Sequence, residues 1–145
     1  MIYLIDSNVF VHAFREIAFG TALRRFHHTH LPHLVLSAVV VHELLVGAVT
    51  AADERSFRRG IVEPFRLRQR LHVPVRQTWD LATKIDRRLR KHRNLESKLR
   101  TRSFFNDVLI AASAREIGAT LVTENREDFG IISDVVGIHY VEPWP

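Results

Sequence analysis

The chain has 145 residues, and its shares of hydrophobic residues (46%) and charged residues (26%) are those of a globular domain with a core of its own. Its 21 Lys and Arg outnumber its 16 Asp and Glu, and the resulting net charge of +5 favours a polyanionic partner, although an arginine-rich proteome would produce the same excess. Because the sequence contains no cysteine, disulfide scaffolds, thiolate zinc sites and cysteine nucleophiles are excluded.

The first residues predict a buried strand followed by a helix. Ile2–Ile5 is an uninterrupted apolar run, and Asp6 then offers an acceptor side chain that can cap a helix carrying Val9 and Phe10. The run is too short for a signal-peptide core, and the sequence has no apolar run of the roughly 20 residues that span a membrane. We therefore expect a cytoplasmic protein that does not enter a membrane.

A second strand and helix follow a histidine-rich stretch. Residues 19–25 form an amphipathic segment, which we expect the histidines and the proline of residues 27–33 to interrupt. Residues 34–36 are an apolar run, Ser37 is a suitable cap, and residues 38–49 predict a helix that is buried on most sides. The spacing of the histidines in residues 27–33 is not that of a recognised zinc site.

The middle of the chain predicts charged helices and one short strand. Residues 53–70 suggest a helix with a kink at Pro64, and residues 72–75 suggest an edge strand, where proline is tolerated. Thr78 is expected to cap the next helix. The apolar face of that helix is predicted to consist of Trp79, Leu81, Ala82, Ile85 and Leu89.

Residues 87–102 are strongly basic, and Glu96 is the only acid among them. A basic helix face can bind RNA phosphates without reading the base sequence, but a helix face exposed to solvent would have the same composition. The candidate RNA-binding residues are Arg87, Arg88, Arg90, Lys91 and Arg93.

The last third of the chain predicts a helix–turn–strand unit. Residues 108–117 are almost wholly apolar and suggest a helix that begins near Asp107 and ends at Gly118. Ala119–Val122 is a short β-prone run, residues 123–128 read as a polar loop, and a last strand is expected over 138–141. The order of these elements predicts one α/β domain over residues 1–145, with a central parallel sheet of four to five strands flanked by helices.

Four acids, Asp6, Glu43, Asp107 and Asp128, each follow a strand or lie near the start of a helix. Because the carboxyl ends of parallel strands share one edge of a sheet, these acids can converge there. Carboxylates that crowd together repel one another, and hard oxygen ligands suit Mg²⁺ or Mn²⁺. Each acid taken alone is also compatible with an ordinary role, as a helix cap, an exposed helix residue or a loop residue.

The sequence around these acids resembles the four acidic motifs of PIN-domain ribonucleases, and most closely those of the VapC-type toxins of toxin–antitoxin modules. The similar segments are residues 4–9, 36–44, 106–112 and 121–129, whereas the likeness is poor over residues 51–103. The resemblance implies a PIN-like fold and metal-dependent endonucleolytic hydrolysis of structured RNA, such as tRNA or rRNA. It also implies a homodimer and a cognate antitoxin that neutralises the enzyme.

Carried over by position, the resemblance assigns roles to individual residues. Asp6, Glu43 and Asp107 correspond to the metal-binding acids and would hold Mg²⁺ or Mn²⁺. Asn125 stands where the family often has an acid, so Asp128 is the candidate for the fourth catalytic carboxylate. The residues implied to orient the ligands or a water molecule are Asn8, Thr123 and Asn125.

Other phosphate-handling classes fit the sequence less well. A phosphatase of the haloacid dehalogenase type needs a second aspartate two residues after the first, where this chain has Asn8. A receiver domain needs paired acids after the first strand and a late lysine, and neither feature is present. The sequence also has no glycine-rich phosphate loop. Two alternatives stay open within the family: a housekeeping PIN nuclease of RNA processing, and a catalytically inactive PIN-like binding module.

Overall fold

The computed structural model describes residues 1–92 and 95–144, and five parallel strands form its central sheet, in the order β3-β2-β1-β4-β5. In the middle of the sheet, Leu4 lies opposite Val35 on one side and Leu121 on the other. The predicted parallel α/β sheet is therefore confirmed. The strands are β1 (Ile2–Ile5), β2 (Leu34–Ser37), β3 (Leu71–His72), β4 (Ala119–Val122) and β5 (His139–Val141).

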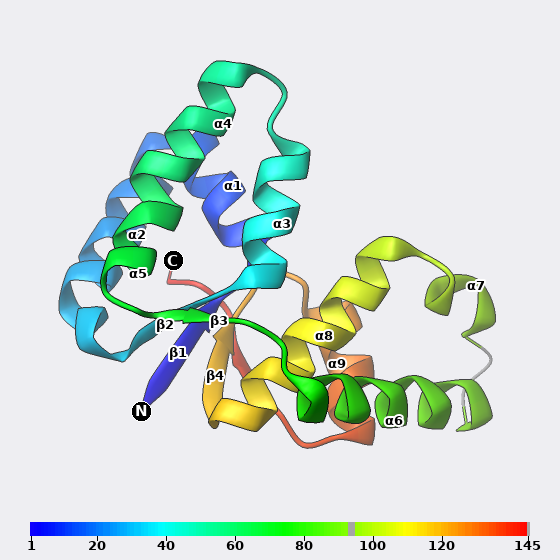
Figure 1. The fold of residues 1–145 in the computed structure, drawn as a ribbon. Helices are drawn as coiled ribbons and strands as arrows, with labels where there is room; N and C mark the ends of the chain where they lie inside the picture. Colours follow the sequence, from blue (N-terminus) through cyan, green and yellow to red (C-terminus); the bar gives the residue numbers. More distant parts are fainter. Residues whose placement is uncertain (93–94, 145) are drawn as a thin grey trace.

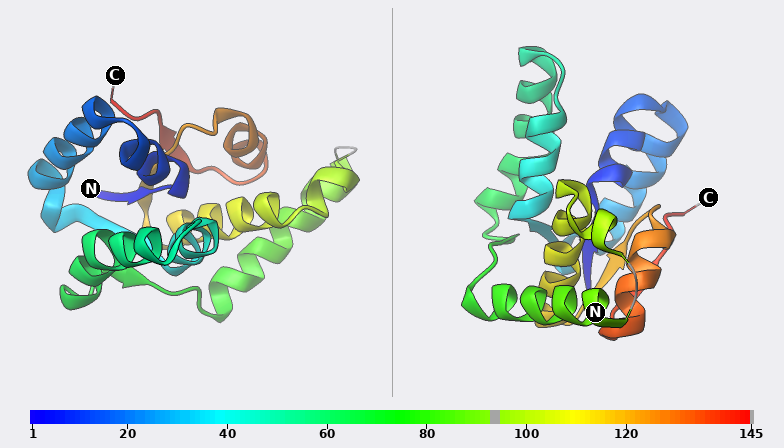
Figure 2. Two further views of the ribbon diagram at one scale, coloured as in Figure 1. Left: turned by 90° about the horizontal axis from the view of Figure 1, so that it is seen from above. Right: turned by 90° about the vertical axis from the view of Figure 1, so that its right-hand side faces the viewer.

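The helices form two groups, and the strands lie where the groups meet (Figure 1). The first group is α1 (Ser7–Arg15), α2 (Ile17–His30), α3 (Ala38–Gly47), α4 (Ala51–Phe57) and α5 (Glu63–Leu67). The second group is α6 (Arg76–His92), α7 (Glu96–Leu99), α8 (Arg102–Ile117) and α9 (Arg126–Val135). Figure 2 shows the long α6 lying alongside α8, with α7 at their far end. In the described residues, no helix is long and apolar enough to cross a membrane.

The core is centred on α8, which contacts β4, α3, α6, α7 and α9. Small residues such as Ala111, Ala112 and Ala114 are fully buried and let these neighbours approach closely, while Phe104 and Ile110 fill the space between them. Burial of each large apolar side chain stabilises the fold by about 1.5–3 kcal/mol. At the C-terminal end of α8, Gly118 adopts a left-handed conformation (φ 66°), as the sequence predicted, and stops the helix before β4.

Two expectations for the first half of the chain are wrong. The histidines do not interrupt α2, which runs to His30 and gives way to a 3₁₀ turn, Leu31–His33, that contains the proline. The helix α3 is not buried on most sides, because Val39, Val40 and Leu44 face the core whereas Val46 is 63% exposed. An apolar sequence thus marks a helix here without showing which of its faces is covered.

In the middle of the chain, the irregularity near Pro64 is a π-helical stretch, Arg58–Val62, that joins α4 to α5. Proline lacks the amide hydrogen that an α-helix needs at this place. Thr78 lies inside α6 rather than at its cap, and its hydroxyl accepts a hydrogen bond from the amide of Val75 (3.0 Å). The buried face of α6 consists of Thr78, Ala82, Ile85 and Leu89, and Trp79 is 47% exposed on another face.

Two boundaries differ in the region that carries the acids. Helix α8 begins at Arg102 because Thr101 caps it, accepting a hydrogen bond from the amide of Phe104 (3.3 Å). Asp107 is therefore in the second turn of the helix and not at its start. Residues 126–135 form α9, which the sequence did not predict, and they place Asp128 in a helical first turn and not in a loop.

Candidate active site

The four acids are brought together from four elements. Asp6 follows β1 and caps α1, and Glu43 lies in α3. Asp107 lies in α8 and Asp128 in α9. Asp6 and Asp107 are 2% and 7% exposed, whereas Glu43 and Asp128 are half-buried. The charges of Asp6, Glu43 and Asp128 all act on Asp107, so the predicted convergence of the four carboxyl groups is found.

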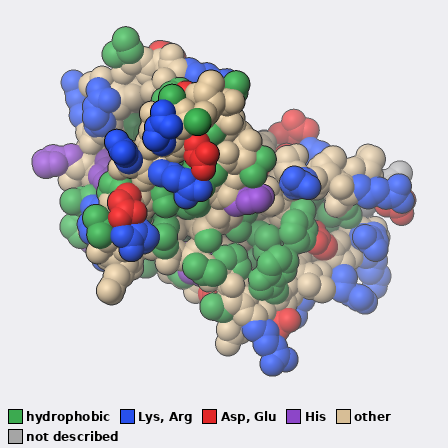
Figure 3. Space-filling view, turned by 45° about the horizontal axis from the view of Figure 1, so that its top comes forward, with side chains coloured by type: hydrophobic (Ala, Val, Ile, Leu, Met, Phe, Trp, Pro, Cys, Tyr) green, Lys and Arg blue, Asp and Glu red, His purple; other side chains and the backbone are tan. Residues whose placement is uncertain are grey.

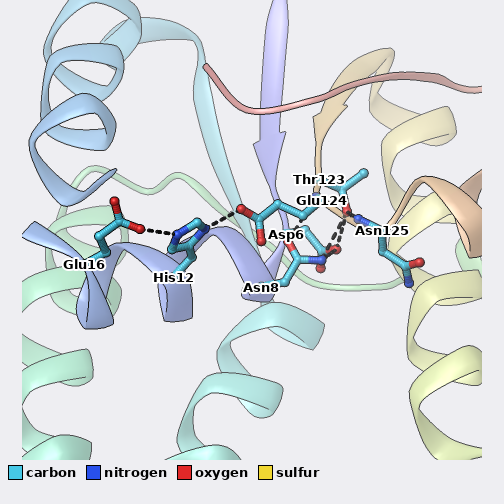
Figure 4. A network of polar contacts seen from close by, with 7 residues as sticks. All are labelled: Asp6, Asn8, His12, Glu16, Thr123, Glu124 and Asn125. Carbon is cyan, nitrogen blue, oxygen red and sulfur yellow. Dashed lines mark hydrogen bonds and ion pairs between the residues drawn. The ribbon is translucent and has the colours of Figure 1, made fainter. Parts of the chain in front are cut away.

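Asp6 is held by neighbours from both ends of the chain (Figure 4). Its Oδ1 accepts a hydrogen bond from the amide of Ser7 (2.8 Å). Its Oδ2 accepts from the hydroxyl of Thr123 (2.7 Å) and from the side-chain amide of Asn8 (3.0 Å). Asn8 in turn accepts from the backbone amide of Glu124 (3.3 Å). These bonds tie the end of β1 to the end of β4 and fix the orientation of the Asp6 carboxyl group.

The same network continues along α1 through His12 (Figure 4). One ring nitrogen lies 2.5 Å from Oε1 of Glu124, and the other lies 2.8 Å from Oε2 of Glu16. The bond to Glu124 and then the bond to Glu16 raise the pKa of His12. The ring also stacks on Phe19, with centroids 3.8 Å apart. His12 thus joins α1 to the segment that carries Thr123.

Glu43 has two partners, Ser7 and Asn106, that are not among the residues predicted for the site. The hydroxyl of Ser7 donates to Oε1 of Glu43 (3.1 Å), and the side-chain amide of Asn106 donates to Oε2 (3.4 Å). Each of these partners is adjacent in sequence to a site aspartate, Asp6 or Asp107, and that adjacency was the available signal. The two bonds connect α3 to α1 and α8 across the site.

Asn125 bridges the other two acids. Its Nδ2 donates to Oδ2 of Asp107 and to Oδ2 of Asp128, at 3.1 Å each. Its Oδ1 accepts from the backbone amide of Asp128 (3.2 Å), which makes it the N-cap of α9. Lys98, from α7, is hydrogen-bonded and ion-paired to Oδ1 of Asp128. In the sequence, Lys98 is part of the basic stretch of residues 87–102, and it is not among the residues predicted for the acidic site.

Burial and mutual repulsion shift the pKa values of these acids. Burial, followed by the charges of Asp6, Glu43 and Asp128, raises the pKa of Asp107 to about 8. Burial also raises the pKa of Asp6, despite its hydrogen bonds, and burial and the charge of Asp6 raise the pKa of Glu43. For Asp128, burial acts in the same direction, but the bonds from Lys98 and Asn125 outweigh it and the pKa is lowered.

The donor set fits a hard divalent cation. Carboxylate oxygens are the ligands that Mg²⁺ and Mn²⁺ prefer, and raised pKa values mark a site where added positive charge would be favourable. Within residues 1–92 and 95–144, no three or more His, Asp or Glu side chains are arranged so that they could hold an ion as they stand. The fit therefore rests on the chemistry of the donors.

The basic residues lie apart from these hydrogen bonds. Arg87, Arg88, Arg90 and Lys91 line a cavity of about 630 Å³ on α6, while Arg93 lies outside the described residues. Figure 3 shows Lys and Arg side chains gathered at the end of the molecule that α6 and α7 form. The guanidinium group of Arg88 also donates to the carbonyl of Val135 (3.3 Å), so this side chain helps to hold α9.

The fold is similar to that of solved toxin–antitoxin proteins. The DNA-bound VapBC from Salmonella typhimurium matches with a TM-score of 0.74 at 20% identity, over 99% of both chains. VapBC-1 from nontypeable Haemophilus influenzae matches with a TM-score of 0.69 at 23% identity, over 98% of both chains. A toxin–antitoxin complex from Klebsiella pneumoniae gives 0.62 at 20% identity, also over 98% of both chains. At such identities the likeness shows the fold alone.

The family itself is shown by the sequence. No curated protein matches the chain, but the PIN domain family model matches residues 3–133. This range contains all four acids and most of the described elements. The chain therefore belongs to the PIN domain family, whose members are typically nucleases.

Proposed function

We propose that the chain is a metal-dependent endoribonuclease and the toxin of a toxin–antitoxin pair. The observation that supports this proposal best is the meeting of Asp6, Glu43, Asp107 and Asp128, with the pKa of Asp107 raised to about 8. A structural role alone does not account for four acids in each other's field, because their repulsion costs stability unless a cation offsets it. A divalent metal ion, which nucleases of the PIN domain family generally use, would be such a cation.

Asp6, Glu43 and Asp107 would hold Mg²⁺ or Mn²⁺, and Asp128 would complete the acidic site. When bound, such an ion lowers the pKa of a coordinated water and offsets charge on the phosphate. The chain's own residues orient the carboxylates. Thr123 and Asn8 hold Asp6, and Asn125 holds Asp107. Hydrogen bonds of this kind fix the orientation of the metal-binding carboxylates before the substrate binds.

The RNA substrate would be held through its phosphates. Arg87, Arg88, Arg90 and Lys91 present positive charge on α6, and Arg93 belongs to the same proposal. Contacts of this kind give affinity that falls steeply with salt. They do not select a base sequence, so we assign the choice of cleavage site to the shape of a structured RNA such as a tRNA or an rRNA loop.

An antitoxin segment would occupy the apolar cavity of about 940 Å³ between α1–α2 and α4–α5. Phe14, Phe57 and Phe65 are among its lining residues, and Arg24 and Arg68 add positive charge. This lining suits an apolar segment that carries acidic residues. The solved structures of similar fold include a toxin–antitoxin complex. We propose the cytoplasm as the place of action, where both RNA and the antitoxin are available.

A homodimer is the third part of this proposal. The helices α3 and α6 leave Val46 and Trp79 exposed to solvent. Burial of such exposed apolar side chains against a second copy of the chain would remove their surface from water, which favours association. Sedimentation of the purified chain at several concentrations would test the dimer independently of RNA cleavage.

The nuclease activity can be tested with purified chain and total RNA in Mg²⁺ or Mn²⁺. Asp107→Asn should lower cleavage at least 100-fold, and a chelator should abolish it, because the site would lose its charge or its ion. Asp80→Asn, an exposed acid on α6, is the matched control and should cleave as the unmodified chain does. Equal cleavage by the Asp107→Asn variant would refute the proposal. Cleavage by neither protein would favour an inactive binding module.

A further inference from the structure

Lys98 is a basic residue whose ammonium group contacts Asp128, one of the four acids of the site. It comes from α7, a helix of four residues between α6 and α8. Its Nζ is ion-paired with Oδ1 of Asp128 and lies 3.5 Å from Oε1 of Glu127. It also lies 5.7 Å from the centre of the Phe104 ring, and the side chain is 28% exposed. Three groups thus hold the ammonium in one place.

The backbone of Lys98 is tied to the helix that carries Asp107. The carbonyl of Lys98 accepts hydrogen bonds from the amide and the hydroxyl of Thr101, at 3.0 and 2.8 Å. Thr101 is the N-cap of α8. Leu95 and Leu99 anchor α7 by packing against the core. The position of the lysine relative to Asp107 is therefore set by packing and capping and not only by its ion pair.

The acids divide into two sides around Asp107. Glu43 lies on the side of Asp6, since Ser7, which donates to Asp6 through its amide, also donates to Glu43 through its hydroxyl. Asp128 lies on the other side, where Asn125 joins it to Asp107. On the first side, the carboxylates of Asp6 and Glu43 accept hydrogen bonds from neutral donors. On the second side, Asp128 has a full positive charge as a partner, and Asn125 contributes a neutral amide.

We propose that Lys98 takes the position of a second divalent ion, so that this site binds one ion, between Asp6, Glu43 and Asp107. The inference rests on the proposed nuclease function only in assuming that a divalent ion binds at the first side. The ammonium group offsets the charge of Asp128 without needing six oxygen ligands. A divalent ion beside Asp128 would lack a full set of oxygen ligands, because Asn125 supplies an amide and not a carboxylate. A tethered cation is also present at any metal concentration.

The test is to count Mn²⁺ ions bound by the metal-free protein, from the electron paramagnetic resonance signal of free Mn²⁺ at pH 7.5. We expect one ion per chain for the unmodified protein and two for Lys98→Met. The double variant Lys98→Met/Asp128→Asn should return to one, because it removes a ligand of the second ion. Lys98→Arg, which keeps the charge, and Lys84→Met, an exposed lysine on α6, should each bind one.

Two ions on the unmodified chain, or no increase in Lys98→Met, would overturn the proposal, and so would the absence of bound Mn²⁺. Lys98→Gln gives a second neutral variant if Lys98→Met does not fold, as judged by circular dichroism. RNA cleavage is measured separately on the same samples. A chain that cleaves RNA while binding two ions refutes only the role of Lys98. One that binds ions as expected without cleaving RNA refutes only the nuclease.

Discussion

At Asp107, burial and the repulsion of Asp6, Glu43 and Asp128 act in the same direction and raise the pKa of the carboxyl group to about 8. The group therefore keeps its proton at neutral pH in the absence of a metal ion. The hydrogen bonds that Asp6 receives from Thr123 and Asn8 do not cancel the effect of burial on its own pKa. Residues of this kind store unfavourable free energy in the metal-free fold. That free energy is released when a cation or a proton arrives.

The stability of the metal-free chain should therefore fall as the pH rises. Between the ordinary pKa of 3.8 and the folded value of about 8, the folded chain binds one more proton at Asp107 than the unfolded chain does. The free energy of unfolding then decreases by up to about 1.4 kcal/mol per pH unit from this residue. Above pH 8 both states have lost the proton, and this contribution stops changing.

Urea unfolding at pH 5, 6, 7 and 8 in the presence of a chelator measures this slope. The free energy of unfolding of the Asp107→Asn variant should depend less steeply on pH than that of the unmodified chain. At pH 8 the variant should be the more stable of the two. Asp80→Asn serves as the control, since its carboxyl group is 65% exposed. If Asp107→Asn keeps the full slope, the proton on Asp107 is not the cause.

At the scale of elements, the close approach of α1 and α2 depends on Gly20. A Cβ atom at this position would lie 2.7 Å from the carbonyl oxygen of Ala13, which belongs to the backbone and cannot move aside cheaply. The two helices pack against each other and place His12 and Phe19 in contact. The position of α1 in turn bears on the site, because Asp6 caps it.

Gly20→Ala should therefore lower the free energy of unfolding by about 1–3 kcal/mol, the usual cost of overpacking. Gly47→Ala is the matched control. It lies at the end of α3 with nothing within 4 Å of an added Cβ, so alanine should be neutral or slightly stabilising there. Chemical unfolding of both variants decides the point, and equal stability of the two would show that α1 and α2 can separate without cost.

On the scale of the whole molecule, charge is divided between regions. The chain carries a net charge of +5, yet four of its acids meet around Asp107, while Arg87, Arg88, Arg90 and Lys91 gather on α6. A nucleic acid would be attracted by the basic region and admitted to the acidic one only with cations present. This separation lets binding and chemistry be tested independently.

The double variant Arg87→Gln/Lys91→Gln should weaken RNA binding whatever the base sequence. It should also reduce the slope of log K against log salt by about 0.7–0.9 for each lost phosphate contact. The measurement is fluorescence anisotropy from 50 to 300 mM salt (a range of about sixfold) in an Asp107→Asn background that does not cleave. Arg55→Gln/Arg59→Gln removes the same charge from the other group of helices. An equal loss in this control would mean that only net charge matters.

Much of the fold follows from local patterns in the sequence. The apolar runs Ile2–Ile5 and Ala119–Val122 form strands, Gly118 ends α8, and Asp6 caps α1, all as predicted. These features depend on residues within one or two turns of each other. The convergence of the four acids could also be predicted, because it follows from the shared edge of a parallel sheet.

Other features depend on contacts between distant parts of the chain. The bond from Thr123 to Asp6 joins residues 117 apart, and that from Asn106 to Glu43 joins residues 63 apart. Lys98 belongs to a basic stretch in the sequence, and only the packing of α7 against α8 brings it to Asp128. The sequence by itself determined which residues carry charge and where strands end. The tertiary structure decided which charges meet, because electrostatic and hydrogen-bonding energies depend on distance in space.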